Sequence, residues 1–221
     1  WERPLYVATT VGSDNYMNLG DNFVQEGLAY RITPFNTKAP GAKNFDTEKV
    51  YNNVMNRFKW GGLDKPGLYI DETVMRMCYT HRHLLAQLAM QLIAEGQNAK
   101  AEKVLRKAEK VLPEYNVPYT FLSGAADMAR AYALIGKKAD AARILNKVWA
   151  DAKSYADYYL QLTGSRFMMS QNDVLRQLYI MQNIADITQA CDHSLADQRL
   201  KTVNALYAVY QAKGGAPYDG E

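Results

Sequence analysis

Residue types that carry out chemistry are scarce in this chain. It has two cysteines and three histidines among 221 residues, and no nucleophile is paired with a base by an evident motif. A phosphate-binding loop is absent, because Gly61-Gly62 is not followed by Lys and Ser or Thr. A Gly-x-Ser-x-Gly nucleophile elbow is absent as well. We therefore expect the chain to be non-catalytic by itself, and we predict no cofactor.

The sequence also lacks a strong charge excess and a long apolar run. Its net charge is +3 with Lys and Arg scattered, which argues against a nucleic-acid partner. No apolar run reaches the roughly 18 residues of a membrane span, and the closest, Leu84 to Ala94, is interrupted by Gln87 and Gln91. The chain opens on Trp1 without an initiator methionine. We expect it to be a piece of a longer protein.

Metal ligands are few and poorly placed. Cys78, His81 and His83 lie close in sequence, but on a helix only Cys78 and His81 share a face. A zinc site needs three or four converging ligands, so we predict no metal site and interpret the histidines as packing at a helix surface. Cys78 and Cys191 are interpreted as buried free thiols. A bridge between them in an oxidising compartment is the alternative.

One helical hairpin occurs twice, with an offset of 40 positions. Matching small residues keep that offset: Ala89 and Ala129, Gly96 and Gly136, Ala101 and Ala141. The alanines would let paired helices cross closely, and each glycine would end a first helix in the left-handed conformation. This pattern predicts a tetratricopeptide-like array, in which each repeat stacks on its neighbours to bury an apolar face.

The predicted fold is mainly α, with a small α/β unit at residues 1–70, tetratricopeptide-like repeats at 71–213 and a flexible tail at 214–221. In the first unit we expect strands at 5–10 and 28–33, a short helix at 19–25, and a helix at 46–58. Because two strands alone are marginal, they need a helix cover or a missing third strand. The helical hairpins are expected at 71–95 with 98–112, 122–135 with 139–162, and 172–190 with 195–212.

The concave face of such repeats is lined by the first helix of each pair, and we predict a binding groove there. Its residues would be Tyr79, His83, Met90, Asp127 and Arg130. We also interpret Ala86, Ser123 and Ala126 as spared from packing, and Arg82 as adding positive charge. An aromatic ring, a thioether and a guanidinium together suit an extended peptide or a glycosylated loop. A solvated surface without a ligand is the alternative.

Three carboxylates lie near the first expected strand: Asp14, Asp21 and Glu26. Paired carboxylates can carry out acid–base catalysis, so a carboxylate-based glycan hydrolase is an alternative function. It would require two carboxylates about 5 to 9 Å apart in one pocket. Turn formation and a helix start explain Asp14 and Asp21 more simply.

The N-terminal stretch of the chain carries a family resemblance. The segments are Arg3-Pro4-Leu5-Tyr6-Val7-Ala8-Thr9-Thr10, then Leu19, then Glu26-Gly27-Leu28-Ala29-Tyr30-Arg31-Ile32-Thr33-Pro34, and later Tyr69-Ile70-Asp71-Glu72-Thr73-Val74. In this order they resemble the bacterial protein O-mannosyltransferase-like family of large membrane proteins. The resemblance spans most of residues 3 to 150.

The resemblance implies a parent protein with a multi-spanning, glycosyltransferase-like N-terminal half. This chain would be the soluble C-terminal region, on the periplasmic or other extracytoplasmic side. The parent's catalytic acidic residue would lie in a loop absent from this chain, so no catalytic residue is transferred. The implied partners are a protein or peptide, such as a glycosylation acceptor, and the parent's own membrane domain. A free-standing tetratricopeptide-type adaptor that grips a peptide is the alternative.

Overall fold

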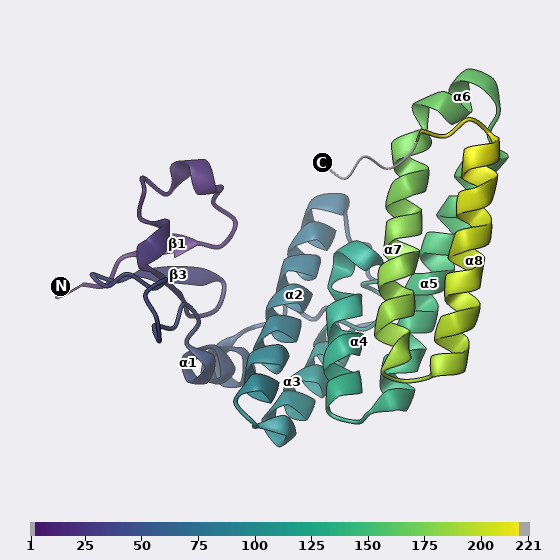
Figure 1. Ribbon diagram of the computed structural model, residues 1–221. Helices are drawn as coiled ribbons and strands as arrows, with labels where there is room; N and C mark the ends of the chain where they lie inside the picture. Colours follow the sequence, from purple (N-terminus) through teal and green to yellow (C-terminus); the bar gives the residue numbers. More distant parts are fainter. Residues whose placement is uncertain (1–2, 217–221) are drawn as a thin grey trace. The chain divides into compact units, whose positions relative to one another are not determined.

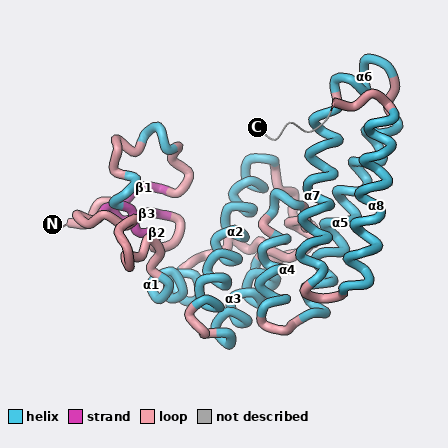
Figure 2. The backbone as a smooth tube through the Cα atoms, viewed as in Figure 1, coloured by secondary structure: helices cyan, strands magenta, loops and turns pink. Residues whose placement is uncertain are grey.

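The computed structural model describes residues 3–216 and contains eight α-helices and three short strands within that range (Figures 1 and 2). The mainly α prediction with a small sheet is confirmed. The chain divides into two compact units, and the boundary in the sequence falls between Asn116 and Val117. Trp1 and Glu2 of the predicted N-terminal unit, and 217–221 of the predicted tail, lie outside the described residues. Between residues 3 and 216, no helix has the length and apolar content to cross a bilayer.

The first unit opens with an antiparallel sheet in the order β1-β3-β2 (Figure 2). The strands are β1 (Tyr6–Ala8), β2 (Phe23–Gln25) and β3 (Ala29–Ile32). The helix predicted at 19–25 is wrong, because a 3-10 turn over Gly20–Asn22 leads directly into β2. The strand missing from the sequence analysis is therefore β2.

The physical reason for this error is the pairing of β2 on both of its edges. Phe23 is buried and pairs with Ile32 of β3. On the other edge, the Gln25 amide donates to the Asn44 carbonyl at 2.8 Å, and the Asp46 amide donates to the Gln25 carbonyl at 3.0 Å. The backbone of residues 23–25 therefore forms its hydrogen bonds with distant parts of the chain. A helical conformation would lose the hydrogen bonds on both edges of this strand.

Two helices of the first unit, α1 and α2, begin where the sequence places capping aspartates. Asp46 accepts from the Lys49 amide and precedes α1 (Thr47–Asn52), and Asp71 caps α2 (Glu72–Ala94) in the same way. The single helix predicted at 46–58 is wrong in its second half, because residues 53–57 form a π-helical turn. One extra residue in that turn frees backbone carbonyls, and Lys107 of the next hairpin donates to the Met55 carbonyl at 2.7 Å.

The remaining helices form hairpins near the predicted positions. In the first unit α2 packs against α3 (Asn98–Val111). In the second unit α4 packs against α5, and α7 against α8, with α5 also lying against α7 (Figure 1). Their bounds are α4 (Ala125–Leu134), α5 (Lys138–Gln161), α7 (Gln171–Gln189) and α8 (His193–Ala212). A short helix that the sequence analysis missed, α6 (Gly164–Met169), connects α5 to α7.

Both copies of the repeated hairpin close their first helix in the same way. Gly96 and Gly136 have φ of 74° and 78°. The amide after each glycine bonds the carbonyl five residues before it: Gln97 to Leu92 at 2.7 Å and Lys137 to Tyr132 at 2.9 Å. The paired alanines at 89, 101, 129 and 141 are all fully buried. The local hairpin geometry therefore follows the sequence repeat, whereas stacking as a tetratricopeptide array stays a prediction.

The C-terminal end of α8 closes the second unit's core. Tyr210 is fully buried in a cluster with Leu160, Phe167, Val174 and Leu178. Beyond the helix, residues 214–216 of the predicted tail contact this end. The Tyr210 hydroxyl donates to the Ala216 carbonyl at 2.9 Å.

Candidate functional site

The residues predicted to form a groove lie on two helices in different units. Tyr79 and Met90 are half-buried and His83 is exposed, all on α2, whereas Asp127 and Arg130 are exposed on α4. Within each helix the spacing of three, four or seven places them on one face. A groove that includes all five residues stays a prediction.

Four neighbouring residues do not have the roles that the sequence analysis gave them. Ala86, Ser123 and Ala126 are buried, so they are not spared from packing. Arg82 is fully buried, and its Nη2 donates to the Leu112 carbonyl at 3.0 Å. Its guanidinium therefore ties α2 to the end of α3 and adds no charge to an exposed groove.

The three-stranded sheet has two faces with different chemistry. Cross-strand partners share a face, and residues two apart along a strand share it too. Gln25 pairs with Tyr30 and Phe23 pairs with Ile32, so these side chains lie on one face. Arg31 pairs with Tyr6 on one side and Val24 on the other, which places those three on the opposite face.

The second face carries a buried carboxylate. Glu26 accepts from the Tyr6 hydroxyl at 2.9 Å and from Arg31 Nε at 2.5 Å, and it forms an ion pair with Lys49 Nζ at 2.6 Å. Asn53 of the π-helical turn donates to the Glu26 carbonyl at 2.8 Å. Burial alone would raise the pKa of Glu26, but the hydrogen bonds from Lys49, Tyr6 and Arg31 outweigh it and hold the pKa below its ordinary value. A carboxylate held ionised in this way fixes the sheet to α1 and is a poor proton donor.

The first face carries a pocket with aromatic walls. Tyr16, Phe23 and Tyr30 form its apolar side: the rings of Phe23 and Tyr30 stack at 5.5 Å, and Tyr16 meets Phe23 edge-on at 4.9 Å. The amide side chains of Gln25, Asn44 and Gln87 also line it, and its volume is about 300 Å³. That volume is at the lower end of the range for small-ligand sites, about 300–1,000 Å³.

The pocket offers neutral hydrogen-bonding groups. Burial, with a smaller contribution from neighbouring Tyr16, raises the pKa of Tyr30, so its hydroxyl stays protonated at neutral pH. Among residues 3–216, the Tyr16 and Tyr30 hydroxyls and the Asn44 and Gln87 amide side chains bond no other side chain or backbone group. These groups are free to bond a ligand. Lys38 also lines the pocket, but its Nζ is paired with Asp21 at 2.6 Å.

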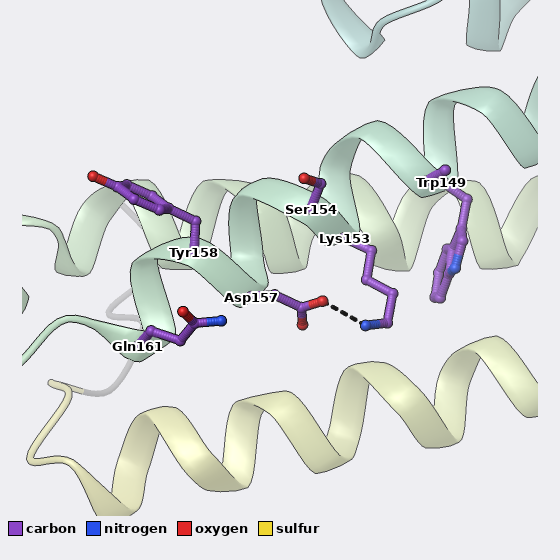
Figure 3. A pocket seen from close by; sticks show the side chains of 7 residues that line it. Trp149, Lys153, Ser154, Asp157, Tyr158 and Gln161 are labelled. Atoms are coloured by element: carbon purple, nitrogen blue, oxygen red, sulfur yellow. Dashed lines mark hydrogen bonds and ion pairs between the residues drawn. The ribbon is translucent and has the colours of Figure 1, made fainter.

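A second concave surface lies along α5 in the other unit (Figure 3). Trp149, Lys153, Asp157, Tyr158 and Gln161 line it. Two of its polar groups are engaged with each other, because Lys153 and Asp157 form an ion pair at 2.6 Å. The Trp149 ring is covered as well, since the guanidinium of Arg199 lies 5.0 Å from its centroid. This surface therefore differs from the aromatic pocket in having a charged pair and an aromatic ring that is already stacked with a guanidinium.

The other candidate side chains have surroundings of their own. Asp14 is exposed and Asp21 pairs with Lys38. His81 packs edge-on against Trp60 at 5.7 Å. Both cysteines are free thiols, and in the described part of the chain no three His, Cys, Asp or Glu side chains are grouped to hold a metal ion.

Comparison with known protein families gives a match over the segment that contains the sheet. Residues 1–52 match TMEM260-associated domain 2. The matched segment contains all three strands, α1 and most of the aromatic pocket's lining. No curated protein and no solved structure matches the chain.

The sequence analysis missed the aromatic pocket because it assigned residues 19–25 to a helix. A helix there would separate Phe23 and Gln25 from Tyr30, whereas a strand pairs them. The available signal was the run Phe23-Val24-Gln25 itself, an aromatic and a β-branched residue after turn-forming Gly20-Asp21-Asn22.

Proposed function

We propose that this chain is a non-catalytic accessory domain of a TMEM260-like, glycosyltransferase-type membrane protein, located on its extracytoplasmic side. The observation that supports it best is the match of residues 1–52 to TMEM260-associated domain 2. The resemblance of the same segment to protein O-mannosyltransferase-like proteins points in the same direction. The domain's role would be to recognise the acceptor that the parent glycosylates.

The chemistry of the sheet supports recognition in preference to catalysis. The buried carboxylate, Glu26, is neutralised by Lys49 and Arg31 and hydrogen-bonded by Tyr6. A general acid needs a pKa near neutrality, and the pKa of Glu26 is shifted the other way. The aromatic pocket on the opposite face has unused donors and acceptors but no charged catalytic pair.

The test of the proposed function is the gene upstream of the codon for Trp1. We expect a long segment with multiple membrane spans, followed directly by this chain. In cells, deleting residues 1–221 from that parent should reduce glycosylation of its acceptors while the membrane domain remains inserted. A gene that encodes only a short leader before Trp1 would exclude the proposal.

A free-standing adaptor that grips a peptide is the second candidate, and the repeated hairpin ends at Gly96 and Gly136 favour it. In that case peptide binding should depend on the predicted groove. Arg130→Ala should weaken binding by on the order of 1 kcal/mol without unfolding the protein. Lys201→Ala, an exposed change on α8, is the matched control. Lys107 is unsuitable as a control because it bonds the Met55 carbonyl.

A further inference from the structure

We infer that the aromatic pocket of the N-terminal sheet binds a neutral saccharide, one pyranose ring in size. This inference rests on the proposed recognition function and names the ligand class of that same site. The pocket is defined by Tyr16, Phe23, Gln25, Tyr30, Asn44 and Gln87, all in the first compact unit.

The first argument is the pairing of an apolar wall with neutral polar groups. A pyranose ring has faces of C–H groups and a rim of hydroxyls that both donate and accept. Aromatic side chains present a negative π face that attracts such C–H groups. Amides and phenols match the rim, because each can donate and accept in the same position.

The second argument is that these polar groups have unused capacity. Within the described part of the chain, neither phenol and neither the Asn44 nor the Gln87 amide bonds another protein group. The Gln25 amide nitrogen donates to the Gly27 carbonyl at 3.0 Å, which leaves its oxygen available as an acceptor. In the free protein such groups form hydrogen bonds to water. The hydroxyl groups of a ligand can displace that water and form the same hydrogen bonds.

The third argument concerns charge. The only ammonium in the lining, that of Lys38, is matched by Asp21 at 2.6 Å. Burial keeps Tyr30 protonated at neutral pH. The pocket therefore has no net charge to select a phosphate or a carboxylate, and its specificity has to come from hydrogen bonds and stacking.

The fourth argument is the backbone that holds one wall in place. Met17 and Asn18, directly after Tyr16, both have positive φ, 48° and 60°. Positive φ is uncommon for residues other than glycine and costs free energy, most of all at Met17. The following turn places Tyr16 edge-on to Phe23. The strained residues Met17 and Asn18 therefore lie in the loop that holds Tyr16, and Tyr16 forms one wall of the pocket.

The experiment is a titration of the whole chain with methyl glycosides of glucose, galactose, mannose and N-acetylglucosamine. Saturation-transfer NMR detects weak binding, and calorimetry gives Kd. We expect at least one of these neutral sugars to bind. Tyr30→Phe removes one hydroxyl and keeps the ring, so it should weaken binding about fivefold. Asn44→Ala should have a similar effect, and Tyr16→Ala a larger one.

Two variants on the α5 surface are matched controls. Tyr158→Phe and Gln161→Ala remove the same kinds of group from the other concave surface and should leave Kd unchanged. If they weaken binding and the Tyr30 and Asn44 variants do not, the inference is wrong. Circular dichroism of each variant checks that it is folded, and Tyr30→Phe keeps the test usable if Tyr16→Ala unfolds.

Three further outcomes separate this inference from the proposed function. Absence of binding by every neutral glycoside overturns the inference, while the upstream gene sequence still decides the proposed function. Preferential binding of glucuronate overturns it too, because the pocket would then select charge. Tight binding of an unglycosylated Ser/Thr-rich peptide that the Tyr30 variant abolishes would support recognition by the pocket and exclude the saccharide.

Discussion

At the scale of single residues, Glu26 illustrates how one buried charge is made tolerable. Its carboxylate is almost wholly buried, but it has three partners, and two of them are cations with partly exposed side chains. Removing a carboxylate from water is costly unless its oxygens are bonded. Because the partners come from β1, β3 and α1, the cost is offset only when all three elements are in place.

We predict that Glu26→Gln destabilises the first unit by about 1.5–3 kcal/mol at pH 7, the usual range for hydrogen bonds to a charged group. The pKa of Glu26 is lower in the folded state. The stabilisation that ionised Glu26 gives the fold is therefore fully present above the unfolded-state pKa of about 4.3. It is lost as the pH falls through the folded-state pKa, which is lower.

Urea denaturation of both proteins at pH 7 and below pH 4 measures this difference. The difference in free energy of unfolding between wild type and variant should become smaller at low pH. A difference that stays constant contradicts the prediction. Glu48→Gln is the control, because Glu48 is an exposed acid that pairs with Lys100 at the surface. A surface pair of this kind contributes little.

The two thiols provide a second prediction at this scale. Burial raises the pKa of both Cys78 and Cys191, and the thiolate is the reactive form. Cys78 is 2% exposed, whereas Cys191 is half-buried. With Ellman's reagent, one thiol should react slowly in the native protein and the second only after unfolding. Cys191→Ser should remove the native reaction, and fast labelling of Cys78 would show that α2 opens easily.

At the scale of elements, the two copies of the hairpin end in equivalent bonds. The left-handed φ at Gly96 and Gly136 lets the following amide reach back five residues. A β-carbon at either position would meet no atom within 4 Å. Strain in the backbone is therefore the only cost of a side chain there.

We predict that Gly96→Ala and Gly136→Ala each reduce stability by about 1–2 kcal/mol, the cost of a left-handed L-residue. Thermal or urea unfolding measures this. Gly12→Ala is the control, because Gly12 has φ of −66° and its added carbon meets only the Asn15 side chain, at 3.9 Å. Clearly different costs at 96 and 136 would indicate that the two hairpin ends are not energetically equivalent.

The end of α8 gives a prediction of another kind. A β-carbon on Gly215 would overlap the ring of Tyr210, which is fully buried. Gly215→Ala must therefore displace residues 214–216 or the ring, at a cost of about 1–3 kcal/mol, as for overpacking. Gly12→Ala, whose backbone has φ of −66° and whose added carbon meets only the Asn15 side chain at 3.9 Å, serves as the comparison. If Gly215→Ala unfolds at the wild-type temperature, the segment does not pack on Tyr210 in solution.

At the scale of the whole molecule, the matched segment and the aromatic pocket belong to the first compact unit. The packing of α4 on α5, of α5 on α7 and of α7 on α8 belongs to the second. We propose different roles for the two parts. In this proposal, the first unit carries the ligand chemistry of the accessory domain. The described part of the second consists of packed helices and includes the concave surface along α5, in which Lys153 and Asp157 are paired.

We predict that the purified chain transfers no sugar from nucleotide-linked or polyprenyl-phosphate-linked mannose, to water or to peptide. The reason is that both oxygens of Glu26 are occupied, Oε1 by Arg31 and Oε2 by Tyr6 and Lys49, which leaves neither to act as nucleophile, base or proton donor. Release of free mannose or a glycosylated product, detected by mass spectrometry, is the measurement. Turnover that Glu26→Gln abolishes, in a variant shown to be folded, would identify a hydrolase and exclude the accessory role.

The sequence by itself determined the features that depend on local chemistry. Asp46 and Asp71 begin helices because their carboxylates satisfy the first free amides, and Gly96 and Gly136 end helices because only glycine adopts positive φ cheaply. The tertiary structure alone decided features that depend on distant partners. Residues 23–25 are a strand because β3 bonds one edge and residues 44 and 46 bond the other. Arg82 is tolerated in the core because its guanidinium donates a hydrogen bond to the Leu112 carbonyl. The aromatic pocket belongs to this second group, since Tyr16, Tyr30 and Gln87 come together only when the sheet and α2 are assembled.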